Sequence, residues 1–321
     1  MPRATDPLPQ DVADEVHILI DALDAEVPFK RLDDNLLIGT WNIRAFGGLV
    51  DKWRSSEDDS PKRDLLSLHC IANIVKRFDV VAIQETKGNL RALRHMLDIL
   101  GPDWGLILTD VTEGAKGNDE RLAFVFDMRR AKPSGLAAEL VVPREWLERG
   151  SKDALEEQFA RTPYAVSFLS GKQTYILVTL HVLFGKDPKD RVPELTAIAD
   201  YMAKWARDIN SWGQNLIVLG DFNIDRLGDP LYQAFTSTGL RTPPELDLVP
   251  RTIFGNDKSQ HFYDQIAWFT GEGGSPALSL TYRNNAGHFD FIPHVMPGMA
   301  KPSLSWRISD HYPLWAEFHN R

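Results

Sequence analysis

The sequence predicts an α/β protein with a four-layered α/β sandwich fold, in which two mixed β-sheets pack face to face and helices lie outside. In the first half of the chain, apolar runs of strand length alternate with segments of helical periodicity, whereas the latter half carries several such runs joined only by loops. Two packed sheets with helices on their outer faces accommodate both patterns. From residue 36 onward no linker is long or polar enough to divide the chain, so residues 36–321 are expected to form one domain.

Helices are predicted where apolar residues recur at steps of three and four. Val12 to Leu23 follows this pattern and the chain then breaks at Pro28, so residues 1–35 are expected to be an N-terminal helical extension outside the main domain. The clearest helix within the domain is Val192–Trp212. The other two expected helices are Pro61–Arg77 and Asn89–Leu100.

Strands are predicted where short apolar runs are rich in β-branched and aromatic residues. The expected strands are Leu36–Ile43, Val80–Gln84, Leu122–Phe126, Ala165–Leu169, Tyr175–His181, Leu216–Leu219, Gln265–Phe269 and Leu314–Phe318. The segment from Tyr282 to Ser303 is rich in Gly, Asn, His and Pro, so it is expected to be a long ordered loop near the functional site.

The composition is that of a globular protein with a hydrophobic core, because 43% of the residues are hydrophobic and 25% are charged. The net charge of -9 excludes a general coat of Lys and Arg, so a polyanionic ligand would have to be held by a metal ion and a few cations. The single cysteine, Cys70, excludes an intrachain disulfide and a cysteine metal site. With neither a signal peptide nor an apolar run of about 18 residues, the protein is expected to be cytoplasmic and monomeric, although export by an unusual route stays open.

Polar side chains follow several predicted strands, at the rim where a layered sheet protein gathers side chains into one cleft. Asn42 ends the first strand and Glu85 follows the second. If these strands are parallel neighbours that end level, an amide and a carboxylate reach one ion, and oxygen ligands suit Mg²⁺ or Mn²⁺. Each residue alone also has an explanation without a metal, Asn42 as a turn cap and Glu85 as a solvated acid.

Asp221 and Asn223 follow the apolar run Leu216–Leu219 and are two positions apart, so in an extended segment both side chains project to the same side. A carboxylate there can orient or deprotonate a water molecule, while the amide holds a phosphate oxygen or a metal ion. An Asx-turn that ends a strand explains the same residues equally well.

Two histidines, His181 and His311, end or follow predicted strands. They differ from ordinary core or surface histidines because Glu120 and Asp264 are available at other strand ends. A carboxylate on one ring nitrogen fixes the tautomer and stabilises the imidazolium, as an acid–base histidine requires. Together with a metal, this set predicts metal-assisted hydrolysis of a phosphate ester, for which no serine or cysteine nucleophile is needed.

The ordered set of motifs resembles the endonuclease/exonuclease/phosphatase superfamily from Leu36 to Phe318, and within it the deoxyribonuclease I-like branch. The motifs that carry the resemblance are Asn42-Ile43-Arg44-x-Phe46-Gly47, Glu85, Glu120-Arg121, Phe159-x-Arg161-x-Pro163, His181, Gly220-Asp221-Phe222-Asn223-x-Asp225, Tyr263-Asp264-x-Ile266 and Ile308-Ser309-Asp310-His311-Tyr312-Pro313. The chain departs from that branch at Asn118, where the branch has a tyrosine that packs on the sugar in the minor groove. The structural disulfides of the branch are also impossible with one cysteine.

This resemblance implies a role for each histidine pair. Glu120 supports His181 and Asp264 supports His311, and the two histidines act as general acid and general base around the scissile phosphate. The residues beside that phosphate are then Asp221 and Asn223. The residues around the metal are Asn42, Glu85 and Asp310. The residues that contact the substrate backbone are Arg44, Arg161 and Lys87.

The leading interpretation is therefore a Mg²⁺- or Mn²⁺-dependent phosphodiesterase that acts as a DNA endonuclease and leaves 5′-phosphate ends by in-line attack of water. A second interpretation keeps the chemistry but changes the substrate to a phospholipid or inositol phosphate, since one fold hosts many substrates. The negative net charge and Asn118 favour it, whereas Arg44 and Arg161 oppose it. A third is a binding protein without activity, which would lack a metal glutamate or a histidine, and every such position is filled here.

Overall fold

The structure is a computed structural model that describes residues 1–32, 34–112, 118–141, 161–182, 191–210, 215–255, 261–270 and 277–320. Its strands form two six-stranded sheets. The strands of sheet 1, in spatial order, are β11 (Tyr282–His288), β12 (Leu314–His319), β1 (Asn35–Phe46), β2 (Val80–Lys87), β4 (Glu120–Asp127) and β3 (Trp104–Leu108). The strands of sheet 2 are β5 (Lys132–Glu139), β6 (Tyr164–Ser170), β7 (Gln173–His181), β8 (Asn215–Ile224), β10 (Phe262–Phe269) and β9 (Leu240–Arg241).

Each sheet is mixed, because one central pair of strands is parallel and the other neighbours are antiparallel. The parallel pairs are β1 with β2 and β7 with β8. Strands β1 and β2 contact β8 across the space between the sheets, and β2 also contacts β7. The carboxyl ends of a parallel pair lie at the same edge of a sheet. Four strand ends therefore meet at one rim of the sandwich.

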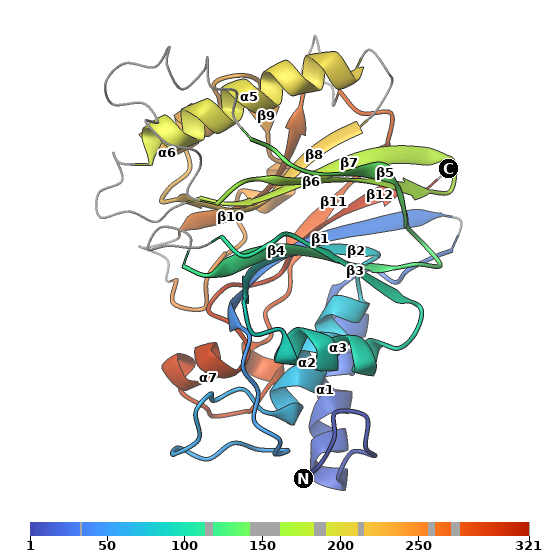
Figure 1. The fold of residues 1–321 in the computed structure, drawn as a ribbon, viewed down its shortest axis with the longest axis vertical. Coiled ribbons are helices and arrows are strands. Elements are labelled where there is room, and N and C mark those ends of the chain that lie inside the picture. The colour runs from blue at the N-terminus through green and yellow to red at the C-terminus, as the bar shows by residue number, and fades with distance from the viewer. Residues whose placement is uncertain are drawn as a thin grey trace.

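Figure 1 shows four layers, with the two sheets in the middle and helices on either side. The sheets bury a hydrophobic core between them that includes Ile38, Phe124, Phe168, Leu219 and Leu314. Residues on alternate positions of the same strands face outward and form two further cores beneath the helices. Both faces of each central strand are thus covered, which explains why these strands are apolar on both sides.

The helices divide between the two outer faces. On the outer face of sheet 1 lie α1 (Gln10–Glu26), α2 (Leu65–Lys76), α3 (Arg91–Leu100) and α7 (Lys301–Arg307). On the outer face of sheet 2 lie α5 (Val192–Asn210) and α6 (Pro230–Thr236). Two short 3-10 turns complete the described elements, η2 (Pro244–Leu246) and η4 (Ile292–His294). Within the residues described, no helix combines the length and apolar character that crossing a membrane requires.

The predicted N-terminal helix is present as α1, and it is packed against the rest of the molecule. Its buried residues, which include Val12, Val16 and Leu19, belong to the same core as α2. Arg77, just beyond α2, donates a hydrogen bond of 2.9 Å to the carbonyl oxygen of Leu23 near the end of α1. The division into a 1–35 extension and a 36–321 domain remains a prediction.

The sandwich and all eight predicted strands are confirmed. The end of the predicted helix Val192–Trp212 lies outside the described residues. The prediction of a loop from Tyr282 to Ser303 was wrong, because β11 pairs with β12 in this segment and α7 begins at Lys301. Strand β11 has the sequence YRNNAGH at an edge of the sheet, so it shows no hydrophobic alternation. The edge strand β5 was also not predicted. It is mostly exposed and contains Pro133 and Gly135, so it too lacks hydrophobic alternation.

Candidate active site

The candidate site begins where the two parallel pairs end. Asn42 lies beside Gln84 on β1 and β2, and His181 lies beside Asp221 on β7 and β8. On the other side of β8, Asp221 is the partner of Asp264 on β10. Residues that are partners in adjacent strands point to the same face of a sheet. The side chains of His181, Asp221 and Asp264 therefore emerge together from sheet 2.

His181 is held between two carboxylates. Its Nδ1 lies 3.1 Å from Oε2 of Glu120, which comes from sheet 1, and its Nε2 lies 3.5 Å from Oδ2 of Asp221. The imidazole is only 7% exposed. The Glu120 carboxylate thus faces Nδ1 at ion-pair distance and the Asp221 carboxylate faces Nε2, so both ring nitrogens lie next to a group that favours a protonated ring.

Glu120 gathers several cations and donors around one buried carboxylate. Nζ of Lys87 lies 2.9 Å from its Oε1, and Nε of Arg161 lies 2.8 Å from its Oε2. Nδ2 of Asn118 donates a hydrogen bond of 2.5 Å to Oε1. Burial alone would raise the pKa of Glu120, but His181, Arg161 and Lys87 outweigh it and lower the pKa to about 2. Glu120 is therefore ionised at neutral pH and able to stabilise a protonated His181.

Asn42 connects the two sheets at the site. Its Nδ2 donates to Oε1 of Glu85 at 3.2 Å and to Oδ2 of Asp221 at 2.9 Å. Its Oδ1 is buried and has no hydrogen-bond partner among the described residues. Two carboxylate acceptors fix which atom of the amide is nitrogen. The unpaired oxygen is thus a free ligand atom beside two acids, and a buried polar atom without a partner is costly unless something else binds it.

The backbone around Glu85 departs from ordinary strand geometry. Glu85 has φ +60° and Ala45, opposite it on β1, has φ +46°. The register of both strand pairs shifts at this point, as in a β-bulge. The amide of Ala45 donates a hydrogen bond of 2.8 Å to Oε2 of Glu85. Left-handed backbone in non-glycine residues is uncommon and clusters at functional sites. Here it turns the Glu85 carboxylate toward Asn42.

Gly220 allows β8 to approach β7 closely just before Asp221. It has φ +141°, and a Cβ atom there would lie 2.1 Å from the carbonyl oxygen of Leu180. Any larger residue would push the strands apart. The glycine therefore sets the short distance between His181 and Asp221.

Asn223 has φ +50°, a conformation that asparagine tolerates better than most residues. Its Nδ2 donates a hydrogen bond of 2.7 Å to the carbonyl oxygen of Val182, and its backbone amide donates to Oδ1 of Asp221 at 2.9 Å. Its carbonyl oxygen accepts from the buried guanidinium of Arg191. The side-chain nitrogen of Asn223 therefore holds the end of β7, and its backbone nitrogen holds the Asp221 carboxylate.

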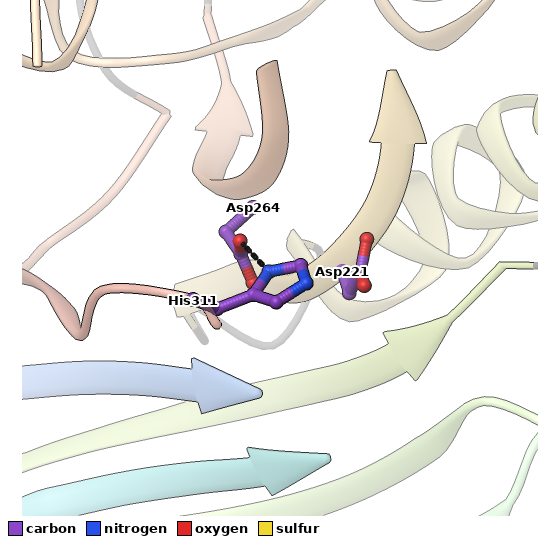
Figure 2. A group of neighbouring side chains, drawn as sticks. All are labelled: Asp221, Asp264 and His311. Atoms are coloured by element: carbon purple, nitrogen blue, oxygen red, sulfur yellow. Dashed lines mark hydrogen bonds and ion pairs between the residues drawn. The ribbon is translucent and has the colours of Figure 1, made fainter. Parts of the chain in front are cut away.

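His311 pairs with Asp264 in the same way that His181 pairs with Glu120. Nδ1 of His311 lies 2.6 Å from Oδ2 of Asp264, and Figure 2 shows the carboxylate of Asp221 on the other side of the imidazole ring. Complete burial raises the pKa of Asp264 to about 6. Burial alone would lower the pKa of His311, but the carboxylates of Asp264, Asp221 and Asp310 hold it well above its usual value.

The segment that carries His311 is fixed by hydrogen bonds from several directions. Oγ of Ser309 donates to the carbonyl oxygen of Asn42 at 2.6 Å and accepts from the amide of His311 at 3.1 Å. Nε1 of Trp41 donates to the carbonyl oxygen of His311 at 2.8 Å. A β-bridge joins His311 to Thr252. The position of the ring is therefore determined before any ligand binds.

Arg251 was not singled out from the sequence, although it organises this side of the site. It is 1% exposed, and its Nε donates a hydrogen bond of 3.0 Å to the carbonyl oxygen of Asp264. Its backbone carbonyl accepts from the amide of Tyr312 at 2.9 Å, next to His311. The sequence around Arg251 mixes apolar and polar residues, so nothing there distinguishes a positioning residue from a surface cation. Asn118 was likewise noted only as a departure, and not as a donor to Glu120.

Of the three predicted metal-binding residues, the structure brings Asn42 and Glu85 together. Oδ2 of Asp310, the third, lies 3.6 Å from Nη1 of Arg44, and its carboxylate acts on the nearby His311. A different trio has ligand atoms within 4.8 Å of one another, namely Asp221, Asp264 and His311. Asp264 and His311 already bond to each other, so the oxygen atoms of Asn42, Glu85 and Asp221 are the ones available to a cation. Carboxylate and amide oxygens fit a hard divalent ion.

The three predicted substrate-contacting cations have different surroundings. The side chains of Arg44 and Lys87 are 27% and 25% exposed. Arg161 is 8% exposed and pairs with Glu120, so it is much less accessible than the other two, and its predicted contact with the substrate stays a prediction. The residue Phe159 of its motif lies outside the described residues.

The sequence is similar to those of known proteins. A model of the Endonuclease/Exonuclease/phosphatase family matches residues 39–311. A protein named Deoxyribonuclease from Thioalkalivibrio sp. (strain K90mix) is 26% identical over 306 residues, which cover 91% of this chain and 73% of that relative. Deoxyribonuclease-1 of Bos taurus is 26% identical over 298 residues, which cover 88% of this chain and 92% of that relative.

Solved structures share the fold at lower identity. The human Nocturnin catalytic domain superposes with a TM-score of 0.58 at 17% identity, covering 88% of this chain and 94% of that one. A mannosyl-6-phosphatase of Bacteroides thetaiotaomicron superposes with a TM-score of 0.57 at 19% identity, covering 88% and 99%. These likenesses establish the fold alone. The family match spans most of the sequence and includes every residue of the candidate site, so the chain belongs to the endonuclease/exonuclease/phosphatase family.

Proposed function

We propose that the protein is a divalent-metal-dependent phosphodiesterase that acts on DNA as an endonuclease and leaves 5′-phosphate ends. The observation that carries the proposal is the position of Asp221 between two histidines, each backed by its own carboxylate. Nε2 of His181 lies 3.5 Å from Asp221, and ligand atoms of His311 and Asp221 lie within 4.8 Å of each other. Displacement at phosphorus needs one proton acceptor and one proton donor close to the same phosphate, and the two histidines supply them.

In the proposed reaction, water attacks the scissile phosphorus opposite the leaving 3′-oxygen. One histidine accepts a proton from the water as the new oxygen–phosphorus bond forms. The other gives a proton to the 3′-oxygen as the old bond breaks, so the products are a 3′-hydroxyl and a 5′-phosphate. Glu120 and Asp264 hold the rings in place and stabilise the imidazolium form. Asp221 lies where it can orient the attacking water.

The residues that would hold the metal are Asn42, Glu85 and Asp310. The fit rests on their oxygen chemistry and on Oδ1 of Asn42, which is buried without a partner among the described residues. A bound Mg²⁺ or Mn²⁺ would supply positive charge to the phosphate oxygens, which is worth several kcal/mol in the transition state. The proposed active form is a monomer.

DNA is the proposed substrate because two relatives that span most of this chain are named deoxyribonucleases. Arg44 and Lys87 are partly exposed cations next to the site, and cations at such positions bind phosphates on either side of a cleaved bond. With a net charge of -9, the chain has to bind a polyanion through such local contacts.

The experiment that tests the proposal is a metal-dependent activity screen. Purified protein is treated with EDTA and supplied with Mg²⁺ or Mn²⁺, then offered supercoiled plasmid, single-stranded DNA, RNA, sphingomyelin and inositol phosphates. We expect nicked plasmid whose ends are sealed by DNA ligase without prior phosphorylation, because ligase requires a 5′-phosphate and a 3′-hydroxyl. Full activity after chelation contradicts the metal. Turnover of a lipid or inositol phosphate without cleavage of any nucleic acid contradicts the substrate.

A further inference from the structure

A large aromatic side chain is exposed next to the site and has no role in the reaction described above. Trp306, near the end of α7, is 48% exposed. The guanidinium carbon of Arg44 lies 3.8 Å from the centre of its ring, which is a close cation–π stack. The stack leaves about half of the Trp306 surface exposed to solvent, so the indole can still contact a ligand.

The Arg44 side chain is held in this stack from its other sides. Nη1 of Arg44 donates a hydrogen bond of 2.7 Å to Oγ of Ser305 and lies 3.6 Å from Oδ2 of Asp310. The buried guanidinium of Arg63 donates to the carbonyl oxygens of Arg44 at 2.7 Å and of Arg307 at 3.0 Å, so it ties β1 to α7. The Trp306–Arg44 pair is therefore a fixed flat surface, continuous with the segment that carries His311.

The charges around this surface favour stacking over ionic attraction as its means of binding. Arg44 is partly neutralised by Asp310, and the chain as a whole is acidic. A nucleobase has two flat faces that stack on an indole or on a guanidinium whatever the base, and this affinity depends little on salt. In an intact duplex those faces are covered by neighbouring bases, whereas an unpaired nucleotide exposes them.

We propose that Trp306 and Arg44 form a stacking platform for one unpaired nucleobase beside the scissile phosphate. The inference rests on the proposed function and adds to it a contact with the substrate: a single strand, a gap or a flap engages the platform, whereas a continuous duplex is bound and cleaved without this contact. On the far side of the site, Asn118 is bonded to Glu120 and offers no aromatic surface. Tyr263 is a second aromatic side chain beside the site, but its ring stacks on His261 and contacts His311, whereas Trp306 is 48% exposed.

The test is a double-mutant cycle in which removal of the Trp306 side chain is combined with removal of the nucleobase that it would contact. Binding of a fluorescein-labelled (dT)12 strand, and of a matched strand whose central nucleotides are abasic, is measured by anisotropy with Mg²⁺ in the His181→Ala background. Gels confirm that the strands stay intact. In that background we compare Trp306 with Trp306→Ala and Trp306→Phe. The matched control is Phe29→Ala, because Phe29 is 52% exposed and stacks with Arg77 at 4.5 Å on the helical side of the molecule.

We expect Trp306→Ala to weaken binding of (dT)12 by about tenfold or more, the effect of losing one stacked base, and to weaken binding of the abasic strand by less than about twofold. Trp306→Phe retains most of the affinity, and Phe29→Ala leaves both strands as they were. Equal losses on the two strands would show that Trp306 acts only through the charge of Arg44, and no loss on either would leave it without a role, so both results overturn the inference. A protein that neither binds nor cleaves any nucleic acid, with Trp306 intact, refutes the proposed function instead.

Discussion

The imidazole of His311 and the carboxylate of Asp264 lie 2.6 Å apart although they belong to different sheets. Asp264 is on β10 of sheet 2, and His311 lies three residues before β12 of sheet 1. The second pair crosses in the opposite sense, because Glu120 is on β4 of sheet 1 and His181 ends β7 of sheet 2. Each sheet therefore contributes one histidine and one supporting carboxylate, and the site exists only where the two sheets are docked.

Removal of either histidine should reduce turnover strongly without unfolding the protein. We expect His311→Ala and His181→Ala each to lower kcat by about 10²–10⁴-fold, the range for a positioned acid or base. The double variant should be little slower than the slower single variant, since groups that act as a unit are not additive. Asp264→Asn should cause a smaller but clear loss, because the ring remains while its orientation and charge support weaken. Near-normal turnover in His311→Ala, on a protein with unchanged circular dichroism, would refute its assigned role.

Glu85→Gln should raise the metal requirement. The substitution keeps the shape of the side chain but removes the negative charge that attracts a divalent cation. We expect the Mg²⁺ concentration for half-maximal activity to increase by about tenfold or more, with activity partly restored at high metal. Calorimetric titration with Mn²⁺ gives an independent measurement of the same affinity. An unchanged metal dependence by both methods would remove Glu85 from the metal site.

Arg44 and Arg161 should behave differently, because only Arg44 is partly exposed. Arg44→Ala should weaken cleavage of a polynucleotide by about tenfold at physiological salt, and hydrolysis of a small aryl phosphodiester much less, since the small substrate does not reach it. Arg161→Ala should slow both substrates by similar factors, because its guanidinium pairs with Glu120, which in turn contacts His181. The ratio of kcat/KM on the two substrates is the measurement. A loss confined to the polynucleotide in Arg161→Ala would instead place Arg161 in contact with the substrate backbone.

Glu120 should contribute to stability above pH 4.5 and lose that contribution in acid. Its folded-state pKa of about 2 lies below the ordinary 4.5, so the folded protein favours the ionised form. The free energy of unfolding should therefore be higher for the native chain than for Glu120→Gln at pH 6. The difference should shrink as the pH falls from about 5 to 2, by about 3 kcal/mol at most. Urea unfolding across this range checks it, with the exposed Glu57→Gln as control. A difference that stays constant with pH would contradict the lowered pKa.

Gly220→Ala should damage both folding and activity. Its Cβ would lie 2.1 Å from the carbonyl oxygen of Leu180, in addition to the strain of φ +141°. We expect a loss of at least about 3 kcal/mol in the free energy of unfolding and a drop in turnover from displacement of Asp221. Gly135→Ala separates backbone strain from the steric clash, because Gly135 has φ +120° but nothing lies within 4 Å of the new Cβ. This variant should lower the free energy of unfolding by only about 1–2 kcal/mol. Similar losses in the two variants would show that the close approach to β7 is unimportant.

The part of the fold that could be predicted from the sequence is the part with strong hydrophobic periodicity. The central strands are buried on both faces and therefore stand out as apolar runs, and polar residues at their ends mark the rim of the sandwich. The contacts of His181 with Glu120 and of His311 with Asp264 were expected from those strand ends together with the family resemblance. The catalytic roles assigned to these pairs stay predictions.

The remainder depends on interactions that leave no periodic signal. Edge strands such as β11 are held by backbone hydrogen bonds to a neighbour, so their side chains can be polar. Two contacts depend on how distant segments pack, namely the pairing of Arg161 with Glu120 and the stacking of Arg44 on Trp306. Spacing along the chain also could not show that Asp310 pairs with Arg44, because that contact depends on the position of α7.

The chain order of the two sheets has a consequence during protein synthesis. Sheet 2 is built from the continuous run β5 to β10, whereas sheet 1 begins with β1 to β4 and is completed by β11 and β12. A chain still on the ribosome holds Glu85, Glu120, His181 and Asp264 long before it holds His311. If the proposed function holds, we expect such a nascent chain to lack activity toward DNA, and activity to appear only when the His311 segment is in place and β12 pairs with β1.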